Sequence, residues 1–359
     1  MTMHDLLRMV VERGASDLHI KAGTRPMLRI DGTLVPIVED RWSDEHVRAL
    51  IAEILTPDQI QTFSKKLELD CAYGLPNVSR YRINIYQQRG AIGAAIRTIP
   101  AAPPNLDKLK LPKVVRRLAM LPRGLVLVTG PTGSGKSTTL AAIVDVINHT
   151  RSCHVVTIED PIEYLHTDDV CIITQREVGQ DTHSFSDALR HVLRQDPDVI
   201  LIGEMRDLET IATAITAAET GHLVLATLHT TSAPQTIDRI IDVFPPHQQA
   251  QVRMQLSVAL EGVLSQTLLP LRTPPGRIAA VEVMVGTPAV RNLIREGKTH
   301  QLFSTMQAGA KEGMHSLNQA LRELVRSQTI SLEVAMSHSS NTAELLQLLG
   351  REGAAAAAL

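Results

Sequence analysis

The chain has 359 residues, which is more than one ordinary domain contains, so two or three domains are expected. Hydrophobic residues make up 44% of it, the composition of a globular protein with large cores. A formal net charge of -2 and an aromatic content of 3% leave little material for a basic face or for stacking on bases, so we expect no nucleic acid partner.

No apolar run approaches the roughly 18 residues that span a bilayer, and the start of the chain is too polar for a signal peptide. We therefore expect a cytoplasmic protein that meets a membrane only peripherally, through its partners. None of the cysteines sits in a CxxC pair, which argues against a zinc knuckle and for reduced packing residues: Cys71, Cys153 and Cys171.

The first 99 residues mix helical periodicity with strand-like alternation. Ser43, followed by a helical apolar pattern, has the position of an N-cap. In chain order the patterns predict a helix at 3–13, two strands at 27–37 around an Asp31-Gly32 turn, a helix at 43–55 and a hairpin at 80–99. These elements indicate a small α+β domain, and the proline-rich segment at 100–112 predicts a linker after it.

Short apolar strands alternate with helices in the second half of the chain. Strands are expected at 125–130, 154–159, 198–203 and 223–229, and helices at 135–149, 247–264, 288–297 and 316–328. This order predicts an α/β fold with a parallel sheet covered by helices on both faces, and an all-helical pattern from Pro246 onward.

One segment between a predicted strand and a predicted helix fits the phosphate-loop pattern GxxxxGK[ST] at every fixed position. Its residues are Gly130, Pro131, Thr132, Gly133, Ser134, Gly135, Lys136 and Ser137. Backbone N–H groups of such a loop, together with the helix N-terminus, bind phosphate. We expect Lys136 to reach the β- and γ-phosphates of ATP, Ser137 to ligate Mg²⁺, and Thr138 to contact the α-phosphate. A glycine turn with a chance lysine explains the flanking strand and helix less well.

Ligands of an open α/β sheet bind beyond the carboxyl ends of its strands, and this rule selects among the acids. Glu204 follows one predicted strand and becomes the expected Walker-B acid, holding Mg²⁺ through water. Asp198 precedes that strand and belongs at the opposite edge. After another strand, either Glu159 or Glu163 should polarise the attacking water.

The sequence leaves the roles of three residues near these strands undecided. Asp160 is equally suited to catalysis and to capping a helix that would start at Pro161. His229, at a strand end, could sense the γ-phosphate, although a single histidine there is usually structural. The role of His222, before the same strand, stays open.

These motifs resemble those of the ATPases of type II secretion and type IV pili. The segments that carry the resemblance are GPTGSGKSTTL, TIEDPIEY, LRQDPDVILIGEMRD and GHLVLATLHT. The resemblance implies a hexamer of two-domain subunits and favours Glu163 over Glu159 as the catalytic acid. It also implies that arginines of the N-terminal hairpin approach the phosphates: Arg80, Arg82 and Arg97. Solvated strand arginines are the plainer interpretation of these three.

The resemblance gives each region of the chain an expected identity. We expect a PAS-like domain at 1–99, the linker at 100–112, a RecA-like ATPase core at 113–288, a helical region at 289–353, and a tail at 354–359 that is either a cloning scar or a frayed helix.

Within that family, the opening SDLHIKAGTRPMLRIDG and residues 289–302 resemble the pilus retraction members. A motor that hydrolyses ATP to depolymerise pilin and drive twitching motility is thereby implied, with a platform protein of the inner membrane and the pilus base as partners. Residues 289–302 are expected to contain an amphipathic helix that Gly297 ends, with Arg291 and Arg295 free for a partner. The alternatives are an extension or secretion ATPase, a nucleic-acid translocase and a nucleotide-binding scaffold without hydrolysis.

Overall fold

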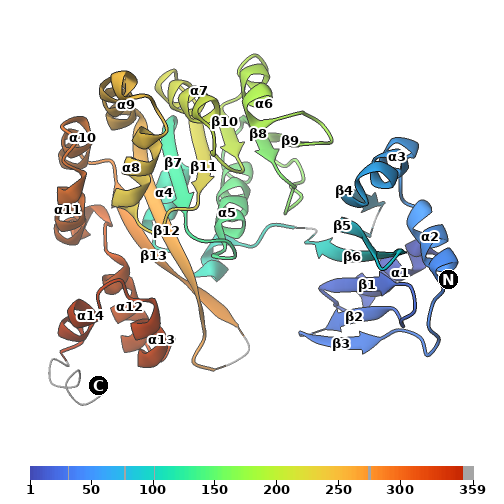
Figure 1. Ribbon diagram of the computed structural model, residues 1–359. Coiled ribbons are helices and arrows are strands. Elements are labelled where there is room, and N and C mark those ends of the chain that lie inside the picture. The colour runs from blue at the N-terminus through green and yellow to red at the C-terminus, as the bar shows by residue number, and fades with distance from the viewer. Residues whose placement is uncertain (31, 77, 101, 274–275, 351–359) are drawn as a thin grey trace. The chain divides into compact units, whose positions relative to one another are not determined.

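The computed structural model describes residues 1–30, 32–76, 78–100, 102–273 and 276–350. Its chain divides into two compact units. One comprises Met1–Ala102 with Glu163–Leu165, and the other comprises Pro103–Ile162 with His166–Leu359 (Figure 1). Asp31 of the expected turn and the tail at 354–359 lie outside the described residues.

The first unit is built on an antiparallel sheet with the strand order β3-β2-β1-β6-β5-β4. Its strands are β1 (Asp17–Lys21), β2 (Met27–Ile30), β3 (Thr33–Pro36), β4 (Glu68–Leu75), β5 (Ser79–Gln88) and β6 (Ala91–Ile99). Its helices are α1 (Met3–Glu12), α2 (Asp44–Ala52) and α3 (Pro57–Lys66). The predicted hairpin is thus β5 with β6, and Ser43 caps α2 as expected, while β1, β4 and α3 were not predicted.

Alternation along β5 separates a core face from a polar face. Tyr81 is fully buried, and its hydroxyl donates to the carbonyl of Leu7 on α1 at 2.8 Å. Burial raises the pKa of Tyr81 to about 12. Because side chains alternate along a strand, the neighbours Arg80 and Arg82 are directed to the opposite face from Tyr81. Arg80 and Arg82 therefore stand on the face of the sheet that α1 does not cover.

The second unit contains a seven-stranded sheet with the order β13-β12-β7-β11-β10-β8-β9. Its strands are β7 (Gly124–Thr129), β8 (His154–Glu159), β9 (Ile172–Glu177), β10 (Val199–Ile202), β11 (Leu223–Leu228), β12 (Leu260–Pro270) and β13 (Arg277–Val285). All neighbours pair in parallel except β12 and β13, which are antiparallel. The expected parallel sheet is present, with an added antiparallel edge strand.

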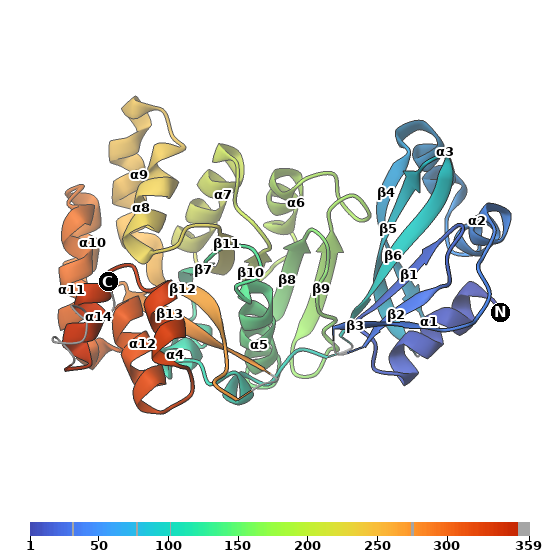
Figure 2. The ribbon, with the colours of Figure 1, turned by 60° about the horizontal axis from the view of Figure 1, so that its bottom comes forward.

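Helices cover both faces of this sheet, as predicted (Figures 1 and 2). Leu125 and Leu127 of β7 join the apolar cluster that contains α6 (Phe185–Val192), α7 (Leu208–Glu219), α8 (Ala233–Asp242) and α9 (Pro246–Ala259). Val126 and Val128 join the opposite cluster, with α4 (Val114–Ala119) and α5 (Lys136–Asn148). Burial on both sides explains why β7, β10 and β11 are continuous apolar runs.

The helix predicted at 247–264 is wrong at its end, as is the all-helical pattern after Pro246. Helix α9 ends at Ala259, and Leu260 begins β12, which lies beside β7. Four apolar residues of β12 are fully buried: Leu260, Val263, Leu264 and Leu269. Packing against β7 and β13 thus decided the conformation of a run whose helical and strand patterns are hard to distinguish in the sequence.

In the described part of the chain, five short α-helices follow the sheet: α10 (Pro288–Arg295), α11 (Leu302–Ala308), α12 (Leu317–Arg326), α13 (Leu332–His338) and α14 (Thr342–Leu348). Val290 and Ile294 of α10 are buried, as the expected amphipathic pattern required. Among the described residues of the whole chain, no helix combines the length and apolar character needed to cross a bilayer.

Arg291 does not project freely from α10, which corrects the expectation for this helix. Its guanidinium donates to the carbonyls of Gly286 at 2.7 Å and Ser257 at 3.1 Å, and also to that of Val258. It further pairs with Glu261 at 2.7 Å. The carbonyls of Ser257 and Val258 belong to the last turn of α9, so Arg291 caps that helix where the chain turns into β12.

We predict that Arg291→Ala lowers the free energy of unfolding by about 2 kcal/mol, because it uncaps carbonyls that accept from a charged donor. Arg295→Ala is the matched control on the same helix. The Arg295 guanidinium is exposed and donates one hydrogen bond, to Asn292, within the described residues, so its loss should stay within about 0.5 kcal/mol. Urea unfolding of both variants measures the difference, and equal stabilities would contradict the capping role.

Candidate nucleotide-binding site

The loop from Gly130 to Gly135 joins β7 to α5, the strand–loop–helix context that the sequence predicted. Gly133 and Gly135 have φ angles of 79° and 88°, in the left-handed region that favours glycine. A Cβ on Gly130 would lie 2.3 Å from the carbonyl oxygen of Gln266, so this position has no room for a side chain. Pro131, Thr132 and Gly133 are exposed, whereas Ser134 is buried.

Gln266 on β12 is the site residue that sequence reasoning missed. Its side-chain amide donates to the carbonyl of Ser134 at 2.7 Å and accepts from the hydroxyl of Thr139 at 3.0 Å. Residues 265–270 fell only under the general helical pattern expected after Pro246, so nothing placed them beside the loop. The available signal was Gln266 among the polar residues that lie between the apolar pairs of VLSQTLL, because a buried amide needs fixed partners.

Lys136 begins α5 and bends back over the loop. Its ammonium donates to the carbonyls of Gly130 at 2.8 Å and Pro131 at 3.1 Å. Ser137 and Thr138 follow in the first turn of the helix and are partly exposed. The structure therefore brings the predicted phosphate-binding residues together at one helix N-terminus, where the helix dipole adds partial positive charge.

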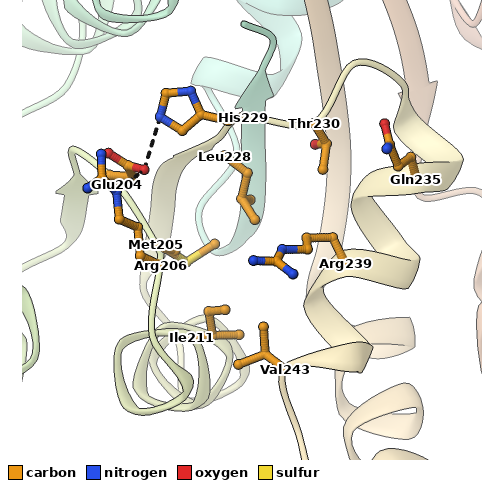
Figure 3. Close-up of a pocket in the computed structure, with 10 residues that line it drawn as sticks. All are labelled: Glu204, Met205, Arg206, Ile211, Leu228, His229, Thr230, Gln235, Arg239 and Val243. Carbon is orange, nitrogen blue, oxygen red and sulfur yellow. Dashed lines mark hydrogen bonds and ion pairs between the residues drawn. The ribbon is translucent and has the colours of Figure 1, made fainter. Parts of the chain in front are cut away.

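Glu204 and His229 meet beyond the ends of β10 and β11. The Nε2 atom of His229 lies 3.0 Å from a carboxylate oxygen of Glu204, and the guanidinium of Arg206 donates to the same oxygen (Figure 3). The hydrogen bond and the charge of Glu204 raise the pKa of Arg206. The Glu204 side chain is 18% exposed, so it is held by partners yet open to a ligand.

A cavity of about 440 Å³ adjoins this pair. Met205, Ile211 and Leu228 give it an apolar wall, and the Arg239 side chain is directed into it (Figure 3). The cavity thus combines an apolar wall with charged groups of both signs, Glu204 and Arg239. No sequence pattern had singled out Arg239.

Asp198 and His222 lie at the opposite ends of their strands. A carboxylate oxygen of Asp198 accepts from the backbone N–H of His154, the first residue of β8, at 2.9 Å. The ring of His222 contacts the carbonyl of Ala217 at 2.9 Å, before β11 begins. Asp198 was expected at this edge, and the structure gives His222 a contact with the end of α7.

The acids at the end of β8 and after it differ in their hydrogen-bond partners. The Glu159 carboxylate accepts from the hydroxyl of Thr157 at 2.6 Å and from the amide of Gln175 at 3.1 Å. Glu163 is exposed, and within the described part of the chain its carboxylate has no hydrogen-bond or ion-pair partner. No helix starts at Pro161, so the capping interpretation of Asp160 is wrong: the chain between β8 and β9 stays irregular.

In the first unit, Arg82 and Arg97 are directly opposite each other on β5 and β6. The Arg97 guanidinium donates to Asp17 at 2.8 Å. Burial alone would raise the pKa of Asp17, but hydrogen bonds from Ser16 and Arg97 outweigh it and hold that pKa below its usual value. Both arginines line a cavity of about 360 Å³ with Asp17, Asp70, Asn84 and Ala95.

The donors near the loop fit a magnesium ion that arrives with a nucleotide. The described residues hold no group of three or more His, Cys, Asp or Glu side chains that could bind a metal ion. Magnesium in nucleotide sites needs few protein ligands, because phosphate oxygens and water complete its octahedron. The Ser137 hydroxyl and the Glu204 carboxylate are hard oxygen donors of the required kind.

Comparison with known proteins gives consistent results over nearly the whole chain. The family model of type II/IV secretion system proteins matches residues 1–347. The type IV pilus retraction ATPase PilT of Pseudomonas aeruginosa is 51% identical over 335 residues, which cover 93% of this chain and 97% of that protein. A twitching motility protein of Neisseria gonorrhoeae is 47% identical over 88% of this chain and 85% of its own length.

The solved structures agree. A crystal structure of the pilus retraction motor PilT with bound ADP matches with a TM-score of 0.91 and 46% identity, over 97% of this chain and 99% of that one. A smaller N-terminal domain followed by an α/β ATPase core is therefore the architecture of this protein. The chain belongs to the family of type II/IV secretion system proteins.

Proposed function

We propose that this chain is an ATP-hydrolysing motor subunit that powers the retraction of type IV pili, and with it pilin depolymerisation and twitching motility. One observation carries the proposal. The phosphate loop, Glu204 and His229 follow parallel strands that end at the same edge of one sheet. This arrangement stands in a chain whose alignment with a PilT retraction ATPase covers 97% of that protein's length.

Nucleotide binding follows from the loop. Its backbone N–H groups and the N-terminus of α5 stabilise the phosphates, and Lys136 exchanges the carbonyls of Gly130 and Pro131 for phosphate oxygens. Magnesium, when bound with the nucleotide, neutralises charge on the phosphates. Ser137 would hold it directly and Glu204 through water.

Hydrolysis requires a positioned water and a sensor of the γ-phosphate. We assign the positioning of the attacking water to Glu163. The carboxylate of Glu159 already accepts hydrogen bonds from Thr157 and Gln175, whereas the carboxylate of Glu163 is exposed. His229 is the sensor, and its contact with Glu204 joins the Walker-B acid to β11. At this site the protein promotes ATP hydrolysis by positioning the reactants and by electrostatic stabilisation, and it supplies no covalent chemistry.

A second cation should come from another surface. Arg82 is exposed, and the described residues contain no hydrogen-bond or ion-pair partner for its guanidinium; Arg97 is held by Asp17. We infer that Arg82 acts across a subunit interface of a hexamer, with Arg80 and Arg97 supporting that surface. The motor works in the cytoplasm at the inner-membrane pilus base, against the platform protein.

We expect Lys136→Ala to weaken binding of MgADP about a hundredfold, because it removes the loop's charge-assisted hydrogen bonds to phosphate. Isothermal titration calorimetry of the purified protein measures the affinity. Lys65→Ala, a change at an exposed lysine of α3, serves as the control and should bind like wild type. Unchanged affinity in Lys136→Ala would remove the nucleotide site from this loop.

Glu163→Gln and Glu204→Ala should leave nucleotide binding near wild type and lower kcat by about a hundredfold or more, because both acids act in the transition state. Phosphate release at saturating ATP, measured beside ADP affinity, separates the two effects. Glu159→Gln is the comparison, because it makes the same change of a carboxylate to an amide at the other candidate acid. A dead Glu159→Gln with an active Glu163→Gln would reverse the assignment.

Arg82→Ala should abolish hydrolysis, and mixing it with Lys136→Ala should restore part of it. Mixed rings contain interfaces that combine one intact loop with one intact arginine, as an arginine supplied in trans requires. The assay is ATP turnover against the mixing ratio, with light scattering to report ring formation. No recovery in rings shown to be mixed would place Arg82 outside the neighbouring site.

A further inference from the structure

Gln266 is a buried polar residue for which the nucleotide chemistry above has no use. Its side chain is 2% exposed, and both ends of its amide are engaged. We propose that Gln266 is a positioning residue, which fixes the phosphate loop in its binding shape by tying the carbonyl of Ser134 to Thr139 on α5. The inference rests on nucleotide binding at this loop.

The geometry explains why an amide suits this place. A planar carboxamide presents a donor and an acceptor at a fixed separation. Here the donor holds the loop at Ser134, and the acceptor holds the first turns of α5 at Thr139. The chain between these two contacts carries Gly135 and Lys136, so the amide spans the point where the loop becomes the helix.

Other contacts leave the loop without a comparable tether. The Ser134 hydroxyl is buried and, among the described residues, has no hydrogen-bond partner. Lys136 contacts the carbonyls of Gly130 and Pro131, but the same ammonium has to move to a phosphate when nucleotide binds. Gln266 can keep its contacts when nucleotide binds, because its two partners, the carbonyl of Ser134 and the hydroxyl of Thr139, have no role in binding phosphate.

The backbone of the same residue adds a second constraint. The carbonyl oxygen of Gln266 occupies the space where a Cβ on Gly130 would lie. Residues 265 and 129 are paired in the register of β12 with β7, so Gln266 stands immediately beyond the end of β7. Strand β12 therefore supports both the start of the loop, at Gly130, and its end, at Ser134.

Four variants of the full-length chain test the proposal. Gln266→Leu removes both bonds and keeps the approximate volume. Gln266→Glu retains an acceptor for Thr139 but, when ionised, opposes the carbonyl of Ser134. Thr139→Val removes only the bond to the helix. Gln255→Leu is the control, since Gln255 bonds Glu219 on α7, away from the loop.

We expect Gln266→Leu to lower MgADP affinity and kcat/KM about tenfold each, because a loop that samples other shapes loses preorganised donors. In Thr139→Val both quantities should fall about threefold, and in Gln255→Leu both should stay at the wild-type value. A residue with only a packing role would lower Tm and leave the affinity of the folded protein unchanged, and this result would overturn the proposal. A loss of affinity in Thr139→Val with none in Gln266→Leu would also overturn it.

Gln266→Glu supplies a second measurement, which does not depend on the fold of the leucine variant. Burial raises the pKa of a carboxyl at this position, and the protonated acid can donate a hydrogen bond while the ionised form cannot. The affinity of this variant, as a ratio to wild type at each pH, should therefore rise as the pH falls from 8 to 6. A flat ratio would contradict the donor role. The Lys136→Ala experiment reports separately on whether nucleotide binds here at all.

Discussion

Parallel pairing of β7 with β11 and β12 is the constraint on which the rest of the ATPase unit depends. Because parallel strands end at the same edge, the loop after β7 and His229 after β11 emerge together, and β10 adds Glu204 beside them. On the other side of β7, β12 brings Gln266 against the loop. Because β7 and β11 are buried on both faces, a one-residue slip would move every side chain into the opposite apolar cluster and disrupt its packing, so this register is costly to change.

The charged groups of the two units separate into those with fixed partners and those without. Arg291 caps α9, and Arg97 holds Asp17, so both contribute to stability through groups that a substitution would leave unsatisfied. Arg82 and Glu163 are exposed and have no such partners in the described chain. The roles proposed above for Arg82 and Glu163 depend on this contrast, because a group that binds and releases a ligand cannot be held by a permanent partner.

A buried carboxylate connects the nucleotide edge to the C-terminal helices. Glu282 on β13 accepts from the backbone N–H of Ala233 at 2.7 Å and from that of Leu317 at 3.3 Å. These are the first residues of α8 and α12, where a negative charge is favourable. Burial raises the pKa of Glu282, and the two backbone hydrogen bonds partly offset that rise. Helix α8 begins shortly after His229, so this one carboxylate joins the element that follows β11 to the C-terminal helices.

The sequence by itself determined the phosphate loop, the strand-end positions of Glu204 and His229, and the fold class, because glycine spacing, apolar periodicity and strand direction are local properties. It did not determine β12, the cap formed by Arg291 or the amide of Gln266. Residues 260–264 read as a continuation of α9, and only the place beside β7 made them a strand. Gln266 lies far along the chain from Ser134 and Thr139, and its partners are a backbone carbonyl and a hydroxyl that no spacing rule connects to it. Tertiary packing decided these features, because each depends on which distant segments are brought into contact.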